Sequence, residues 1–154
     1  MIREATVGDA ALIAEEFWYP LAQEMEPYSA LNELCEDALE RATAGFEELL
    51  AADQRWDFLL ETDGAAVGYV SAEADTRATR THDSYLAIPD LYVKPGFRGE
   101  GHGTALLERV ERLAEVEGCE FITLGTEWAN DRARAFYEAN GYEPKQVEYA
   151  KLVA

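Results

Sequence analysis

The 154-residue sequence has few cysteines and no long apolar run. Its two cysteines, Cys35 and Cys119, are too few and too far apart for a disulfide framework or a zinc site. We expect each to be a small buried residue, with a nucleophilic role left open. No stretch approaches the roughly 20 apolar residues of a membrane-spanning helix, so we expect no membrane partner. Met1–Ala5 contains no apolar signal region, which predicts a cytoplasmic protein.

Basic residues are also scarce. The chain has 31 Asp and Glu residues against 13 Lys and Arg, and its formal net charge is −18 at pH 7. Nucleic-acid backbones need a basic surface, so we expect no nucleic-acid partner. An acidic excess of this size resembles proteins from salt-loving organisms, in which high ionic strength screens self-repulsion. We take this halophilic interpretation as a working hypothesis; the alternative is an ordinary acidic protein.

Glycine is concentrated in one stretch, Leu91–Thr104, which predicts the end of a strand, a turn and the start of a helix. Leu91–Val93 is β-prone, Pro95 stops the strand, and glycines alternate at positions 99, 101 and 103. From Leu106 onward apolar residues recur at helical spacing. Gly118 is well placed to end that helix in a left-handed conformation.

Such a turn can bind an anion. Glycines let a ligand approach the backbone, consecutive N–H groups then face one concavity, and the positive end of the helix dipole lies behind them. Arg98 and Thr104 can add a guanidinium and a hydroxyl. A dinucleotide fingerprint is excluded because position 106 is Leu, and a P-loop is excluded because Gly-Lys-Ser/Thr is absent. The alternative is that the glycines only make a tight strand–helix connection.

Two spaced motifs favour the anion site. The first consists of Arg98, Gly101 and Gly103, preceded by Leu91, Val93 and Pro95. The second consists of Asn130, Ala133, Tyr137, Gly141 and Tyr142. In this order they resemble the two signatures of the GNAT superfamily of N-acyltransferases. The resemblance is close over residues 86–142 and holds in outline for the rest of the chain.

The sequence predicts one α/β (α+β) domain over residues 1–154. The expected strands are Ile2–Ala5, Trp56–Thr62, Ala66–Ala74, Ser84–Val93, Glu120–Thr126 and Gln146–Val153. The expected helices start at Thr6 or Asp9 with an interruption at Phe17–Pro20, cover residues 29–52, and follow Gly103 and Asn130. A GNAT fold would be a mixed, mostly antiparallel twisted sheet of about six to seven strands flanked by about four helices. It would be splayed between strands four and five, here Leu86–Val93 and Glu120–Thr126.

The resemblance implies residues that bind acetyl-CoA. The backbone of Leu91, Tyr92 and Val93 would pair with the pantetheine arm. The pyrophosphate would lie on the backbone N–H groups of Arg98, Gly99, Glu100, Gly101, His102, Gly103 and Thr104. Asn130 and Tyr137 would contact the arm and the sulfur, although Asn130 also suits a plain helix cap. A local basic patch would come from Lys94, Arg98, Arg132 and Arg134.

The resemblance also implies catalytic roles. Tyr137 is the candidate general acid, because a phenol with a pKa near 10 can protonate a leaving thiolate; the alternative is a core aromatic beside Phe136. Asp90 is the candidate general base, with Glu73, His82 and Glu127 in reserve. Some relatives carry a glutamate at the position of Gly125, so that route is missing here.

We therefore predict an N-acetyltransferase that transfers the acetyl group of acetyl-CoA to a primary amine of a small molecule or peptide. Direct attack in a ternary complex is favoured because no Cys–His pair suggests an acyl-enzyme, and no metal is expected. The alternatives are a non-enzymatic acyl-CoA-binding module and a transferase acting on a protein N-terminus or lysine. Trp18, Tyr19, Tyr28 and Trp128 are candidates for the acceptor pocket, the core or a homodimer interface.

Overall fold

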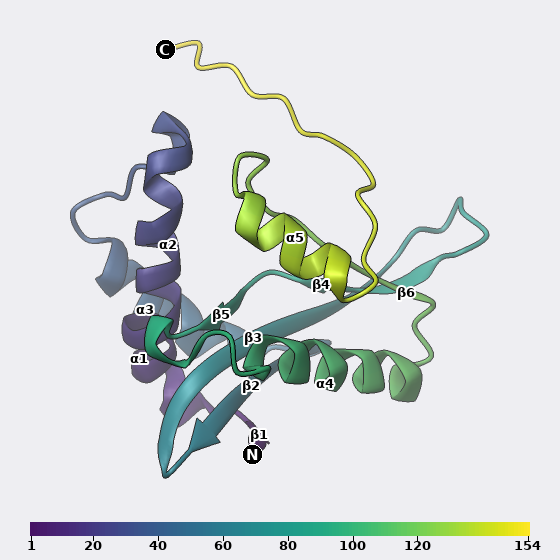
Figure 1. Ribbon diagram of the computed structural model, residues 1–154, viewed down its shortest axis with the longest axis horizontal. Coiled ribbons are helices and arrows are strands. Elements are labelled where there is room, and N and C mark those ends of the chain that lie inside the picture. Colours follow the sequence, from purple (N-terminus) through teal and green to yellow (C-terminus); the bar gives the residue numbers. More distant parts are fainter.

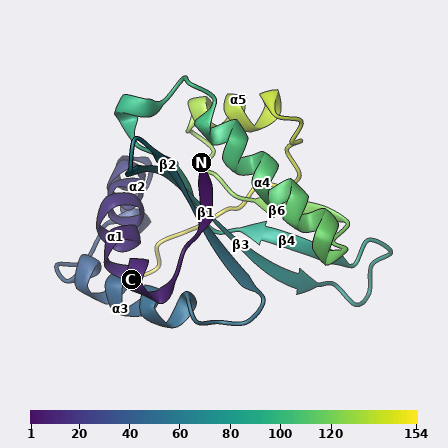
Figure 2. The same cartoon turned by 90° about the horizontal axis from the view of Figure 1, so that it is seen from below.

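In a computed structural model of residues 1–154, one six-stranded sheet lies between two layers of helices (Figures 1 and 2). The strands are β1 (Ile2–Glu4), β2 (Arg55–Thr62), β3 (Ala65–Thr76), β4 (Ser84–Ile88), β5 (Leu91–Val93) and β6 (Phe121–Leu124). The helices are α1 (Ala10–Ile13), α2 (Tyr19–Met25), α3 (Ala38–Leu49), α4 (His102–Glu117) and α5 (Asp131–Ala139). No helix is both long and apolar enough to span a membrane.

The sheet is mixed and mostly antiparallel, as predicted. Its order is β1-β2-β3-β4-β6, and β5 pairs with β3 beside β4. Only the β4–β6 pair is parallel. The β2–β3 hairpin turns at Asp63–Gly64, whose φ angles of 51° and 80° match the two left-handed positions of a type I′ turn. The fold class predicted from the sequence is confirmed.

Alternation along the central strands builds one core on each face of the sheet. Phe58 and Val70 belong to the core against α4. Leu59 and Tyr69, their neighbours along the strands, belong to the core against the N-terminal helices. Each face is therefore apolar, and the helix layers fix the orientation of the strands that border the site.

The predicted strand Ser84–Val93 is broken at Pro89–Asp90. The first half is β4, which pairs with β3 and β6, and the second half is β5, which pairs with β3 alone. Pro89 has no N–H to donate to a ladder, and the backbone of Asp90 instead pairs with Ser71 of β3. As a result β5 and β6 diverge, and the sheet is open between them.

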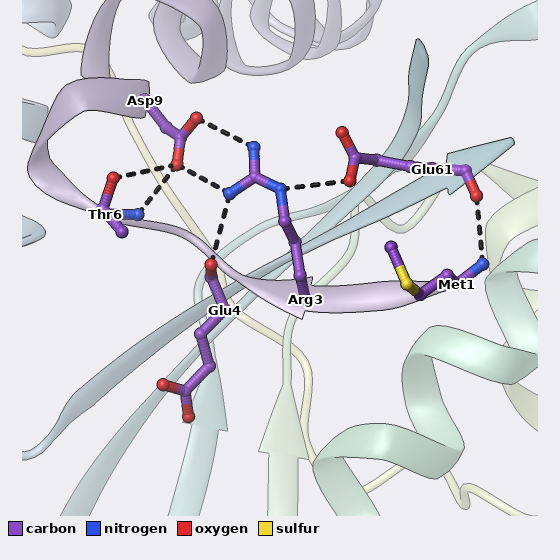
Figure 3. Close-up of polar contacts among 6 residues, drawn as sticks. All are labelled: Met1, Arg3, Glu4, Thr6, Asp9 and Glu61. Carbon is purple, nitrogen blue, oxygen red and sulfur yellow. Dashed lines mark hydrogen bonds and ion pairs between the residues drawn. The ribbon is translucent and has the colours of Figure 1, made fainter. Parts of the chain in front are cut away.

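The N-terminal strand is tied to two other elements by Arg3 (Figure 3). Its Nη1 and Nη2 donate to the two carboxylate oxygens of Asp9 at 2.9 and 3.0 Å, and its Nε donates to Glu61 at 3.1 Å. Asp9 also accepts from the Thr6 N–H at 2.8 Å, and its pKa is lowered, chiefly by the hydrogen bond from Arg3. Arg3 thus joins β1 to the start of the first helix and to β2.

The first helix is interrupted where Pro20 predicts it. Between α1 and α2 the backbone forms a π-helical segment, Ala14–Trp18, and Pro20 lies in the first turn of α2. Proline has no N–H to donate four residues back, and a π-bulge is one way to absorb that break.

Two other predictions about the N-terminal half are wrong. The helix expected over residues 29–52 begins only at Ala38, because the preceding chain is held as a loop. The Asn32 Nδ2 donates to the Met25 carbonyl at 2.9 Å, and the Leu34 N–H donates to Glu26 at 3.1 Å. Cys35 lies in this loop and is exposed rather than buried, while Cys119 is half-buried.

The strand predicted at Gln146–Val153 is also absent. Residues Glu143–Ala154, here called the C-terminal arm, are exposed throughout and form no strand. None of them makes a hydrogen bond within the chain. Figure 1 shows the arm in yellow, leaving the end of α5 and extending away from the sheet. The alternation of apolar residues is strand-like, but no strand of this chain pairs with it.

Candidate active site

A cavity of about 1160 Å³ opens at the sheet end where β5 and β6 diverge. Its walls come from α2, β5, the start of α4, the β6–α5 connection, α5 and the C-terminal arm. Of the cofactor-binding and catalytic residues predicted from the sequence, every one except Glu100 lines this cavity. The structure therefore brings together residues that lie up to 47 positions apart in the chain, from Asp90 to Tyr137.

The glycine-rich loop presents unpaired backbone donors. Gly99 and Gly101 have φ angles of 81° and 86°, which favour glycine. Gly101 precedes the first residue of α4. None of the N–H groups from Gly99 to Thr104 donates a hydrogen bond within the chain. A run of free N–H donors at a helix N-terminus is suited to binding an anion.

Gly103 is also required by packing within the chain. It lies inside α4, and a Cβ at this position would come within 2.8 Å of the Phe136 ring. The glycine therefore lets α5 pack closely against α4. This contact places the second motif, which contains Phe136 and Tyr137, against the loop of the first.

The strand β5 has one free edge. Asp90 and Lys94 are hydrogen-bonded to β3 through Ser71 and Val67, respectively. Because backbone groups alternate in direction along a strand, Tyr92 also faces β3, and Leu91 and Val93 face the gap. Leu91 and Val93 therefore have backbone groups free for a ligand, whereas the Tyr92 backbone is paired with β3.

The predicted basic patch is largely neutralised by acidic partners. The Arg98 Nε donates to the Val93 carbonyl at 2.8 Å, and its Nη2 donates to both carboxylate oxygens of Glu24 at 3.1 Å. Lys94 pairs with Glu16 at 2.5 Å. Arg134 stacks on the Trp128 ring and pairs with Asp131 at 3.4 Å. Arg132 lines the cavity and has no ion pair.

Arg98 thus positions more than one element. Its guanidinium also lies over the Tyr92 ring, 5.1 Å from the ring centre. Through Glu24 it joins the cofactor-side loop to α2, which forms the opposite wall of the cavity. No local pattern in the sequence indicates Glu24 as a partner of Arg98, because the two residues are 74 positions apart.

Asp90 lies near a group of charges in which Arg55 and Asp57 are buried and Glu73 is partly exposed. Its backbone N–H donates to the Ser71 Oγ at 3.2 Å. Arg55 pairs with Asp57 at 2.9 Å and with Glu73 at 2.5 Å. Burial raises the pKa of the Asp90 carboxyl to about 6, Arg55 opposes that rise, and Asp57 and Glu73 add to it. A carboxyl with this pKa can take up a proton near neutral pH.

Tyr137 lies on α5 with its ring packed edge-on against Phe136 and Tyr142, at centroid distances of 5.2 and 6.2 Å. Burial raises the pKa of its phenol to about 12. The hydroxyl makes no hydrogen bond within the chain, and the residue lines the cavity. It is therefore a proton donor without a partner.

Asn130 is buried and caps α5, with its Oδ1 accepting from the Ala133 N–H at 3.1 Å. Its Nδ2 makes no hydrogen bond within the chain. The cap and a ligand contact are compatible, because they use different atoms of the same amide.

Two of the four aromatic residues that are candidates for an acceptor pocket lie at the cavity. Trp18 and Trp128 line the cavity, whereas Tyr19 and Tyr28 do not. Among the reserve bases, Glu127 lines it and accepts from the Asn32 Nδ2 at 2.7 Å. Glu73 is engaged by Arg55 and His82 lies in an exposed loop beside Glu120, so neither lines the cavity. No group of His, Cys, Asp or Glu is arranged to hold a metal ion.

The fold and both motifs agree with a family model. Residues 16–142 match the model of the acetyltransferase (GNAT) family, and the chain belongs to this family. The resemblance stated from the two motifs is confirmed.

Relatives at about 30% identity carry the same assignment. An uncharacterised N-acetyltransferase of Bacillus subtilis is 31% identical over 142 residues, covering 92% of this chain and 89% of its own. The thialysine N-epsilon-acetyltransferase of Bos taurus is 30% identical over 152 residues, covering 92% and 82%. An uncharacterised N-acetyltransferase of Methanocaldococcus jannaschii is 30% identical over 102 residues, and the match spans only 45% of its length.

Solved structures share the fold. The tetramutant of the BH1408 protein from Bacillus halodurans superposes with a TM-score of 0.87 at 19% identity, over 99% of both chains. A predicted acetyltransferase from Clostridium acetobutylicum, solved with acetyl-CoA, superposes with a TM-score of 0.77 at 20% identity, over 99% of this chain and 95% of its own.

Proposed function

We propose that this chain is an acetyl-CoA-dependent N-acetyltransferase that acetylates a primary amine by direct attack in a ternary complex. One observation carries the proposal: the free N–H groups from Gly99 to Thr104 border the same cavity as Asp90 and Tyr137. An anion-binding loop, a carboxyl with a pKa near neutrality and an unpartnered phenol are the groups that such a transfer uses. One domain covers residues 1–154 in this proposal.

The residues present fit acetyl-CoA. The N–H groups of the loop suit a pyrophosphate, and the free edge of β5 at Leu91 and Val93 suits the amides of a pantetheine arm. The bound thioester supplies an activated acetyl group. Gly99, Gly101 and Thr104 line the cavity beside that edge, so one extended ligand can reach both.

Each group in the cavity has a separate task. Asp90 accepts the proton that the acceptor ammonium must lose, since a primary ammonium has a pKa near 10. The Val93 N–H is directed at the gap and can donate to a carbonyl oxygen as negative charge develops on it. The C–N bond forms as the C–S bond breaks, the Tyr137 hydroxyl gives its proton to the departing thiolate, and the second proton lost by the attacking nitrogen restores the phenol. Holding both reactants in one cavity also lowers the barrier to reaction, because the two reacting groups are already close to each other.

The cavity favours a cationic acceptor. Asp90, Glu127 and Glu148 line it, and of its two lining arginines Arg98 is already paired with Glu24 while Arg132 is unpaired. Trp18 and Trp128 add aromatic walls that suit an ammonium. Two relatives are named for amine acceptors, thialysine in Bos taurus and an aminoglycoside in Salmonella typhimurium. We include in the proposal that the net charge of −18 is an adaptation to high salt.

The direct test is an assay of thiol release from acetyl-CoA with a panel of diamines, amino acids, aminoglycosides and peptides, run at low and molar KCl. We expect release that depends on a cationic amine and is weak with neutral amines. Calorimetry with coenzyme A runs in parallel. Tight binding without release for any amine would favour a sensing module, and no binding at all would reject the proposal.

A further inference from the structure

One hydrogen bond joins two walls of the large cavity that lie far apart in the sequence. The Asn32 Nδ2 donates to the Glu127 Oε1 at 2.7 Å, across 95 positions of the chain. Asn32 belongs to the loop after α2, and Glu127 belongs to the connection between β6 and α5. Both residues are partly buried and both line the cavity. The bond therefore connects two of the segments that border the acceptor side of the site.

Each partner in this bond is also held by the backbone. Asn32 donates from Nδ2 to the Met25 carbonyl at 2.9 Å, so both hydrogens of its amide are used. Because both acceptors are oxygen atoms, the nitrogen of the amide must face them. Glu127 lies in the turn before α5, where its carbonyl accepts from the Asn130 N–H at 3.0 Å. The Glu127 carboxylate is therefore held in one position, and its Oε2 makes no hydrogen bond within the chain.

Glu127 and Asp90 are two separate anions in one cavity. They follow β6 and β4, in which Leu124 and Ile88 are paired in parallel register, and beyond that pair the two segments diverge. The charges that act on the Asp90 carboxyl come from β2 and β3, and Glu127 is not among them. Arg132, the unpaired arginine of the cavity, lies on α5 and forms a salt bridge with neither carboxylate. The two carboxylates can therefore bind two different cations.

The residues next to Asn32 and Glu127 in the sequence are apolar and exposed. Leu31 and Trp128 are 54% and 59% exposed, and both line the cavity. The Arg134 guanidinium lies over the Trp128 ring, 3.9 Å from the ring centre, and holds it in place. Apolar surface beside a carboxylate suits an aliphatic chain that ends in an ammonium group.

We propose that Glu127, positioned by Asn32, binds a second cationic group of the acceptor, and that the substrate is an amine with two positive charges separated by an aliphatic spacer. This inference rests on the proposed function and names the substrate class of the same cavity. The first ammonium loses its proton to Asp90 and reacts, while the second keeps its charge at Glu127. Leu31 and Trp128 contact the spacer. Binding of the second group holds the reacting nitrogen near the thioester.

The first test compares acceptors that differ in the second charge. Thiol release from acetyl-CoA is measured with butylamine and with linear diamines that have propane to hexane spacers. We expect kcat/KM for at least one diamine to exceed that for butylamine by about 10–100-fold, the size of one charge-assisted hydrogen bond. Equal values for butylamine and every diamine would overturn this inference and leave the proposed function standing. No release with any amine would reject the proposed function and this inference with it.

The second test assigns the preference to Glu127. Glu127→Gln keeps the size of the side chain and an oxygen that can accept from Asn32, and it removes the charge. The variant should lose the preference for diamines through a higher KM. The matched control, Glu33→Gln, removes a charge from an exposed residue of the same loop that does not line the cavity, and it should keep the preference. A preference that survives in Glu127→Gln, or an equal fall in kcat with butylamine and with diamines, would contradict the proposal.

The third test asks whether Asn32 acts through Glu127. Asn32→Leu removes the donor at similar volume and should raise KM for diamines. The double variant Asn32→Leu/Glu127→Gln should then bind diamines no worse than Glu127→Gln alone, because the two residues form one unit. Losses that add would show that Asn32 does not act by positioning Glu127. Glu127→Gln keeps the hydrogen bond to Asn32, so it tests the second cation site even where Asn32→Leu fails to fold.

Discussion

The surroundings of Asp90 destabilise the charged form of its carboxyl group. Its folded pKa of about 6 lies above the value near 4 of an unfolded aspartate, so folding is penalised progressively from pH 4 to pH 6 and fully above it. Asp90→Asn removes that penalty. We expect the variant to melt at a higher temperature than wild type at pH 8 and at the same temperature at pH 4. An equal difference at both pH values would show that the carboxyl is not titrating.

The same substitution should cost activity. If Asp90 is the base, the turnover of wild type rises with pH through about 6, and Asp90→Asn loses that rise. The loss should shrink as pH approaches the pKa of the amine itself, because the free amine is then abundant. The measurement is a pH profile of kcat/KM for both proteins. Parallel profiles would move the role to Glu127 or to a water chain.

In contrast to Asp90→Asn, a substitution of Tyr137 should leave the stability of the fold unchanged. Tyr137→Phe keeps the ring that packs on Phe136 and Tyr142 and removes only an unpartnered hydroxyl. A donor used only as the thiolate leaves shows as a fall in kcat with little change in KM, and loss of a general acid costs about 10²–10⁴-fold. Turnover of the variant should be partly restored with a thioester of a more acidic thiol. Full kcat in the variant would leave Tyr137 as a core aromatic.

At the scale of elements, the glycine-rich loop requires glycine at position 101 because of its backbone conformation and not because of crowding by neighbouring atoms. A Cβ at Gly101 meets no atom within 4 Å, but its φ of 86° is unfavourable for alanine by roughly 1–2 kcal/mol. Gly101→Ala should therefore distort the free N–H groups and weaken acetyl-CoA binding. The control is Gly96→Ala, which has open space and no left-handed φ. Calorimetry that finds equal affinity for the two variants would reject the loop as the pyrophosphate site.

Local sequence patterns predicted the helices, strands and turns that carry the site. The features that these patterns failed to predict depend on contacts between residues far apart in the chain. The turn, the α4 start and the α5 cap follow from glycine, proline and asparagine at fixed offsets. The break between β4 and β5 depends on Ser71, a strand away, which holds the backbone of Asp90. The short α3 depends on the amide of Asn32, which Met25 and Glu127 engage. No local signal in the sequence encodes these partners.

At the scale of the whole molecule, the charge of −18 sets the dependence of stability on salt. Self-repulsion between exposed carboxylates weakens as the Debye length falls from about 10 Å at 0.1 M to about 3 Å at 1 M. We expect the melting temperature to rise steadily from low salt to molar KCl. A melting temperature that does not change with salt would contradict the hypothesis.

The pairing of Arg98 with Glu24 and of Lys94 with Glu16 has a consequence for how an anion is attracted. With those cations neutralised, the attraction falls to the amide dipoles of the loop, which do not titrate, and to Arg132, which lines the cavity without an ion pair. Dipolar fields also decay faster with distance than those of ions. We therefore expect an anionic ligand to be recognised mainly at short range, by amide dipoles whose strength depends little on salt, with little attraction over long distances.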